Sequence, residues 1–192
     1  MTKNAKKTKR LIVGISGASG IAFGWRIMEL LQSMPVETHL VVSPAAEMTL
    51  ALEMDKKIAD LRAMADVNHP FKDIAAPIAS GSFKTDGMII APCSVKTMSE
   101  IASGITQSLL TRAADVILKE RRKLYLMVRE SPLHLGHLRT MSTLSEIGAT
   151  IAPPVPALYA KPDSLDDMIT HTAARALDHF DLECDETYRW KD

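Results

Sequence analysis

The chain has 192 residues, 46% hydrophobic and 24% charged, which is enough for one globular domain with a full core. Lys and Arg number 23 and Asp and Glu also number 23, so the balance does not point to nucleic acid as the main partner. No stretch reaches the ~20 apolar residues of a membrane span. The two cysteines form neither a metal-type pair nor a disulfide framework, so we expect a cytoplasmic protein without a bound metal.

The chain begins with a basic stretch that contains Lys3, Lys6, Lys7, Lys9 and Arg10. Only a strand-length apolar run follows it, with no small-residue cleavage site, which argues against a signal peptide. We expect residues 1–9 to form a disordered, solvated tail. We expect residues 10–192 to form a single domain, since no linker, repeat or low-complexity block interrupts them.

A buried strand is predicted at 11–15, followed by a turn of small residues and a helix that begins near Ile21. Gly14, Gly17 and Gly20 let the backbone turn tightly and approach a ligand without a Cβ clash. The helix would aim its first N–H groups at whatever lies over the turn, which favours an anion. The segment is therefore a candidate phosphate cradle for a nucleotide or a flavin; the alternative is a tight turn without a ligand.

Apolar runs then alternate with helical patterns along the rest of the chain. Further strands are predicted at 38–43, 87–91, 123–128 and 149–152, and helices at 21–33, 44–54, 94–103, 107–121, 135–147 and 164–180. Nearly continuous apolar strands separated by helices are typical of a parallel sheet with helices on both faces. The sequence therefore predicts an α/β fold.

Polar groups follow the predicted strands. They lie at 16–19, at Ser43, at 92–97, at Arg129 with Glu130, and in a proline-rich loop that ends at Tyr159. In open parallel sheets, ligands bind beyond the carboxyl ends of the strands. A purely structural sheet does not need hydroxyl and ionisable groups at these ends, so we expect the functional site there.

Several of these residues have a structural interpretation beside the functional one. Ser94 fits an ordinary helix N-cap as well as it fits a ligand contact. No His and Asp pattern marks Cys93 as a nucleophile, so we interpret it as a small buried residue. Glu53 ends an otherwise apolar helix and, read from the pattern alone, is a solvated surface carboxylate.

Basic residues cluster on the predicted helix at 107–121. Arg112 and Lys119 are seven residues apart, about two turns, so they can share a face. With Arg129 they would form a cationic pocket for a phosphate. The alternative is that the basic helix end complements the helix dipole.

Motif absences narrow the ligand class. The P-loop pattern is missing, which excludes a P-loop enzyme. The strand before Ser43 does not end in the acidic residue that a dinucleotide site needs for the ribose 2′-hydroxyl. A mononucleotide such as FMN fits this arrangement better than NAD does.

The chain resembles the flavin prenyltransferases, the UbiX-like proteins once labelled aromatic-acid decarboxylases, over nearly its whole length from Arg10 to Trp190. The residues that carry the resemblance occur in the family's order: 11–20, Glu53 with Asp55, 79–82, 92–97, 112–116, 119–122, 128–132 and Tyr159. The resemblance implies a three-layer, Rossmann-like (flavodoxin-like) flavoprotein domain that forms a homo-oligomer, commonly a dodecamer. It also implies an enzyme that transfers the dimethylallyl group of dimethylallyl monophosphate to N5 and C6 of reduced FMN without a metal, releases phosphate, and passes prenylated FMN to a UbiD-type decarboxylase.

The resemblance also implies roles for individual residues. FMN contacts would fall on Gly17, Ala18, Ser19, Ser43, Ser94, Val95, Lys96, Thr97 and Arg129. Substrate contacts would fall on Lys119, Arg129, Glu130, Tyr159 and Arg175, with Arg112 joining across a subunit boundary. Ser19, Glu53 and Glu130 would handle protons, and Ser80 and Ser82 would belong to a flexible loop over the site.

The sequence departs from the family at one position. Some members place a Trp before the Ser-Gly-Ser loop, where this chain has Ile74, while Trp190 matches a family Trp near the end. Two alternative functions share the fold: a flavin-dependent cysteine decarboxylase, and a non-catalytic FMN-binding subunit.

Overall fold

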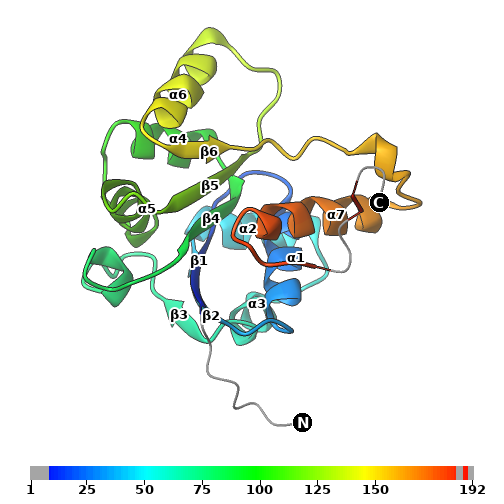
Figure 1. Ribbon diagram of the computed structural model, residues 1–192, viewed down its shortest axis with the longest axis horizontal. Helices are drawn as coiled ribbons and strands as arrows, with labels where there is room; N and C mark the ends of the chain where they lie inside the picture. Colours follow the sequence, from blue (N-terminus) through cyan, green and yellow to red (C-terminus); the bar gives the residue numbers. More distant parts are fainter. Residues whose placement is uncertain (1–8, 185–187, 190–192) are drawn as a thin grey trace.

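A computed structural model describes residues 9–184 and 188–189 of the chain, which fold around a six-stranded parallel sheet (Figure 1). The strand order is β3-β2-β1-β4-β5-β6, and every pair of neighbours is parallel. The strands are β1 (Lys9–Ile15), β2 (Val36–Val42), β3 (Val67–His69), β4 (Gly87–Cys93), β5 (Lys123–Val128) and β6 (Ala149–Ile151). The order reverses between β1 and β4, and ligands bind at such a switch point in open α/β sheets.

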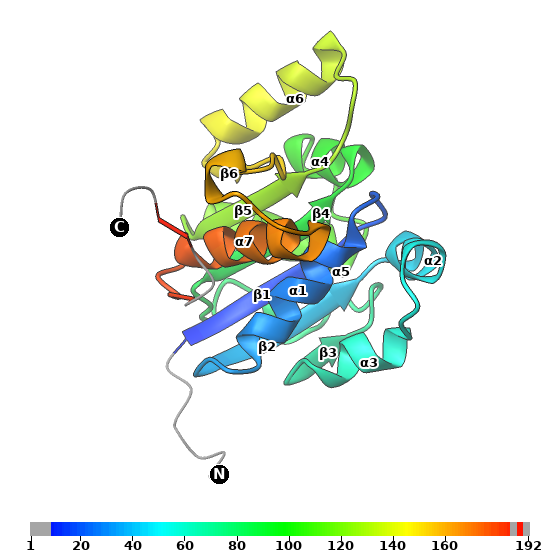
Figure 2. The same cartoon turned by 90° about the vertical axis from the view of Figure 1, so that its right-hand side faces the viewer.

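Helices lie on both sides of the sheet in Figure 1, and Figure 2 views the sheet through one of these two helical layers. One face packs against α1 (Ile21–Leu31), α2 (Pro44–Glu53), α3 (Ile58–Ala63) and α7 (Leu165–Asp178). The other packs against α4 (Val95–Ala102), α5 (Leu109–Lys119) and α6 (Leu135–Glu146), while two 3₁₀ turns, η1 (Pro77–Ala79) and η2 (Leu158–Ala160), lie in the loops. Strand residues alternate between two separate cores, with Leu11 and Val13 in one and Ile12 in the other. The predicted three-layer α/β fold is confirmed.

The short elements are the ones that the sequence did not predict. The edge strand β3 has three residues and α3 has six, too few for a clear periodicity. Lys9, placed in the tail by the sequence, begins β1, whereas the rest of the expected tail and Trp190 lie outside the described residues. None of the helices within 9–184 and 188–189 has the length and apolar character needed to cross a bilayer.

Candidate functional site

The candidate site lies where β1 and β4 end, at the switch point of the sheet. Ser16 joins the two strand ends: its hydroxyl donates to the Pro92 carbonyl at 2.9 Å and accepts from the Ser94 amide at 2.7 Å. The Ser16 side chain is buried, so these two bonds hold the turn after β1 against the residues that lead into α4. The turn after β1 and the start of α4 thus lie side by side at the carboxyl edge of the sheet.

The turn after β1 is shaped by packing and by backbone conformation. A Cβ on Gly17 would lie 2.4 Å from the Cβ of Ala45 in α2, so only glycine lets α2 pack this close to the turn. Gly20 has a φ of +96°, which L-residues rarely adopt, and it caps α1. The sequence predicts that Gly17 lets a ligand approach the backbone. The structure adds a second reason for glycine at this position, which is the close packing of α2.

The first N–H groups of α1 are engaged by the protein's own carboxylate. Glu53, the last residue of α2, accepts from the Gly20 amide at 2.8 Å and from the Ile21 amide at 3.2 Å. The expectation of an anion at this helix start is met by Glu53 itself, and a ligand phosphate there would face an adjacent negative charge. Glu53 is therefore not the simply solvated carboxylate that its sequence context indicates.

The environment of Glu53 keeps it ionised. Partial burial raises the pKa of Glu53. Hydrogen bonds from Ser19, Gly20 and Ile21 and the positive charge of Arg129 together lower it by more, so the pKa lies below its usual range. Arg129 follows β5, and its amide donates to the Cys93 carbonyl at 3.1 Å. Ser19, Glu53 and Arg129 therefore form one charged cluster at the carboxyl edge.

The hydroxyls of two predicted FMN contacts cap helices. Ser43 accepts from the Ala46 amide at 3.1 Å and begins α2. Ser94 accepts from the Thr97 amide at 3.3 Å and donates to the Thr97 hydroxyl at 3.1 Å, so the N-cap interpretation of Ser94 holds. Lys96, on the outer side of α4, lies 2.6 Å from Glu100.

Cys93 and the histidines add no nucleophile or metal centre to this cluster. Cys93 is fully buried, and burial raises the pKa of its thiol to about 12, which confirms its interpretation as a packing residue. His134 and His137 stack on each other with ring centroids 3.6 Å apart at the start of α6. Over the described part of the chain, no three His, Cys, Asp or Glu side chains are grouped to hold a metal ion.

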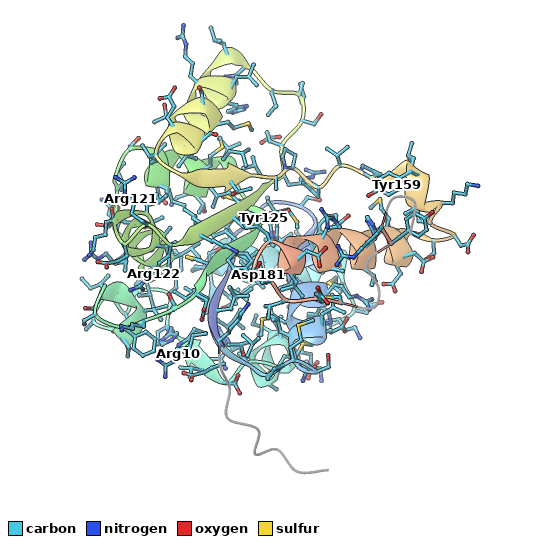
Figure 3. All side chains as sticks on the ribbon, viewed as in Figure 1. Arg10, Arg121, Arg122, Tyr125, Tyr159 and Asp181 are labelled. Carbon is cyan, nitrogen blue, oxygen red and sulfur yellow. The ribbon has the colours of Figure 1, made fainter. Side chains whose placement is uncertain are left out.

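Tyr159 and Arg175 lie on the α7 side of the molecule. Tyr159 packs against His171 of α7, with ring centroids 6.1 Å apart, and Figure 3 shows it beyond the end of α7 that is distant from Tyr125. Arg175 pairs with Asp178 and lies near Tyr125. Burial raises the pKa of Tyr125, and the charge of Arg175 offsets part of that rise. Arg175 therefore lies on α7 and Tyr159 packs against that helix, away from the Ser19, Glu53 and Arg129 cluster of the same chain.

Lys119 and Arg112 lie on the opposite face of the sheet, on α5. Lys119 precedes β5 and Arg129 follows it, so the six-residue strand separates them by roughly 20 Å. Lys119 pairs with Glu120, and Arg112 donates to the Ala79 carbonyl at 3.2 Å and pairs with Asp115. Within one chain Lys119 therefore does not meet Arg129, because α5 directs its basic end toward the amino edge of the sheet, and a pocket that combines them stays a prediction that needs a second copy.

The Ser80–Ser82 loop also lies away from the crevice of its own chain. It precedes β4 and runs beside α5, where Arg122 donates to the Gly81 carbonyl at 2.7 Å and to the Phe83 carbonyl at 2.9 Å. Figure 3 shows Arg121 and Arg122 on this α5 side. Glu130, in contrast, lies next to Arg129 at the carboxyl edge, exposed, and accepts from the Ser131 amide at 2.9 Å.

Comparisons with known proteins agree on one family. A family model described as Flavoprotein matches residues 1–176. The flavin prenyltransferase UbiX of Escherichia coli (strain K12) is 57% identical over 186 residues, which cover 95% of this chain and 98% of that protein. UbiX of Thauera aromatica is 54% identical over 181 residues, covering 94% of this chain and 93% of that protein.

Solved structures lead to the same group. AnUbiX in complex with FMN and dimethylallyl pyrophosphate matches with a TM-score of 0.94 at 46% identity, over 96% of this chain and 98% of that one. A dodecameric FMN-dependent UbiX-like decarboxylase from Escherichia coli O157:H7 matches with a TM-score of 0.93 at 48% identity, over 95% and 100% of the two chains. The cysteine decarboxylase TvaF, at 18% identity and a TM-score of 0.61, shares the fold alone.

Proposed function

This chain belongs to the UbiX-like flavin prenyltransferases, and we propose that it joins the dimethylallyl group of dimethylallyl monophosphate to N5 and C6 of reduced FMN. The product, prenylated FMN, then serves a UbiD-type decarboxylase. The observation that carries the proposal is the cluster of Ser19, ionised Glu53 and Arg129 at the switch point of the sheet. It combines a cation for a phosphate with proton-transfer groups at the edge of the sheet where ligands bind in this class of fold.

The residues at the carboxyl edge fit FMN. Its contacts in our proposal are Gly17, Ala18, Ser19, Ser43, Ser94, Val95, Lys96, Thr97 and Arg129. Because Glu53 occupies the start of α1 and Glu47 lies in the first turn of α2, we place the FMN phosphate at the start of α4. The first turn of α4 has no acidic residue and carries the Ser94 and Thr97 hydroxyls.

Reduced FMN supplies the nucleophile for prenyl transfer, and the side chains around it manage charge and protons. Arg129 stabilises the negative charge on the leaving phosphate without a metal. Glu130 or the released phosphate accepts the proton that the second bond-forming step removes from the flavin ring. Glu53 and Ser19 relay protons at the crevice wall.

We infer that a second copy of the chain completes the substrate site. Tyr159 and Arg175, on the α7 side, reach the phosphate at the carboxyl edge of a neighbour, where Tyr159 donates a hydrogen bond and Arg175 adds charge. The dodecameric state of a relative supports a homo-oligomer. Lys119 and Arg112 keep a substrate role only by family resemblance, since both have acidic partners on α5 and neither lies at the crevice of its own chain.

One experiment tests this function directly. The purified protein is incubated anaerobically with reduced FMN and dimethylallyl monophosphate, and the flavin product is identified by mass spectrometry. We expect singly prenylated FMN, with slower turnover of dimethylallyl pyrophosphate. Unchanged flavin with both prenyl donors refutes the proposal, and oxidative decarboxylation of a peptide ending in cysteine would instead support the cysteine decarboxylase alternative.

A further inference from the structure

Two arginines share one carboxylate at the C-terminal end of α7. Asp178 has a side chain only 10% exposed and accepts from Arg175. Arg189 approaches the same group, with Nη1 3.3 Å from Oδ2 and Nη2 3.3 Å from Oδ1. The side chains of Arg175 and Arg189 remain 49% and 44% exposed. Asp178 therefore fixes two guanidinium groups while leaving part of each open to a ligand.

The same segment links this pair to Tyr159. His171 lies one turn before Arg175 on the same face of α7. The Tyr159 ring lies 6.1 Å from the His171 ring and 6.0 Å from the Tyr188 ring, and the Tyr188 carbonyl lies 3.2 Å from Nε2 of His171. Because Arg189 directly follows Tyr188, one short stretch contacts both Tyr159 and the carboxylate that holds Arg175.

The two arginines line a pocket that also contains Asp181, and Lys123 pairs with that acid. The pocket has a volume of about 550 Å³ and includes both arginines and Asp181. Lys123 lies 3.0 Å from Asp181, and its hydrogen bond and charge hold the pKa of that carboxyl below its usual range. An exposed third acid, Glu183, also lines the pocket, but Asp178 is the carboxylate that bonds to both arginines.

We propose that Asp178 is a positioning residue that holds Arg175 and Arg189 side by side as a paired guanidinium site for the phosphate of the prenyl substrate. The proposal rests on the proposed function, in which Arg175 contacts that phosphate, and it adds Arg189 as a second contact. Guanidinium groups match phosphate oxygens in a bidentate geometry. An arginine held in place before binding loses less rotamer freedom when the phosphate arrives, so pre-organisation by Asp178 increases affinity.

The test uses the FMN-loaded oligomer with dimethylallyl monophosphate as the varied substrate. We expect Asp178→Asn and Arg189→Ala each to raise KM roughly fivefold or more, with a smaller effect on kcat and none on FMN affinity. The inhibition constant of inorganic phosphate should rise in parallel, which a general loss of folding would not produce. Arg189→Lys should restore only part of the affinity, because an ammonium group lacks the planar fork.

Asp181→Asn is the matched control, since it removes a carboxylate from the same pocket that pairs with lysines, and its KM should equal that of the wild type. If Arg175→Ala raises KM while Asp178→Asn and Arg189→Ala do not, the inference is overturned and the proposed function stands. If the wild type forms no prenylated flavin, the proposed function fails. In that case, calorimetric titration with inorganic phosphate still tests the paired site of Arg175 and Arg189. Equal phosphate affinities of the wild type and Asp178→Asn would overturn the proposal.

Discussion

Replacing Glu53 by glutamine tests the cap that closes the start of α1. The amide keeps the size of the side chain but loses the charge, so its single oxygen is a weaker acceptor for the Gly20 and Ile21 amides, both of which donate to Oε2 of Glu53. Loss of an N-terminal cap costs about 1 kcal/mol, and the exposure of Glu53 keeps the effect in the lower part of the 0.5–2 kcal/mol range. For a domain of this size we expect the melting temperature to fall by about 2–4 °C at pH 7.

The pH dependence gives the sharper criterion. Glu53 has a lower pKa in the folded chain than in the unfolded one, where a glutamate has a pKa of about 4.3. Its contribution is therefore complete above that pH and is lost as the pH falls through the folded pKa. Melting of wild type and Glu53→Gln, measured at one protein concentration between pH 7 and pH 3.5, should show a difference that shrinks toward acid pH.

Glu47→Gln is the control for this experiment, because Glu47 lies on the same helix and pairs with Arg62 at the surface. An exposed pair contributes about 0–1 kcal/mol, so this variant should melt close to the wild type. If Glu53→Gln melts like the wild type at pH 7, or if its deficit is the same at every pH, the capping and charge assigned to Glu53 are refuted.

Four further predictions concern single residues. Gly17→Ala should destabilise the fold by about 1–3 kcal/mol in urea titrations, because its Cβ would meet Ala45 at 2.4 Å; wild-type stability would contradict the packing. Cys93, with a thiol pKa of about 12, should resist iodoacetamide at pH 8 until the protein is unfolded, and rapid labelling of the native protein would exclude its burial. Glu130→Gln should keep FMN binding and slow prenylation by roughly 100-fold, and wild-type turnover would remove Glu130 from the mechanism. Arg175→Ala should weaken binding of dimethylallyl monophosphate by about 1.5–3 kcal/mol without changing FMN affinity in parallel titrations, and a loss of both affinities would make Arg175 structural.

The long, periodic elements of the fold could be predicted because each carries its own signal. The apolar runs of β1, β4 and β5 are buried on both sides, and the small-residue turn at Gly17–Gly20 follows β1 as predicted. Strand ends with polar residues indicated the carboxyl edge, where the structure places Ser19, Glu53 and Arg129 in one cluster. The packing that ties Glu53 to α1 had no such signal, since a contact across 33 residues of sequence leaves no local pattern.

The separation of Lys119 from Arg129 within one chain has a definite physical cause. Spacing along a helix tells which residues share a face, but the position of that face relative to the sheet depends on how the helix is connected. In a parallel sheet each crossover helix runs against the strands, so a basic helix end that precedes a strand lies at the amino edge of the sheet. Lys119 precedes β5 and Arg129 follows it, so the two lie at opposite edges of the sheet. In our proposal, Arg175 of α7 and Tyr159 of η2 reach the carboxyl edge of a neighbouring copy. Under this proposal, Tyr159 and Arg175 meet Arg129 at one phosphate only in the oligomer, so dissociating it should abolish prenyl transfer.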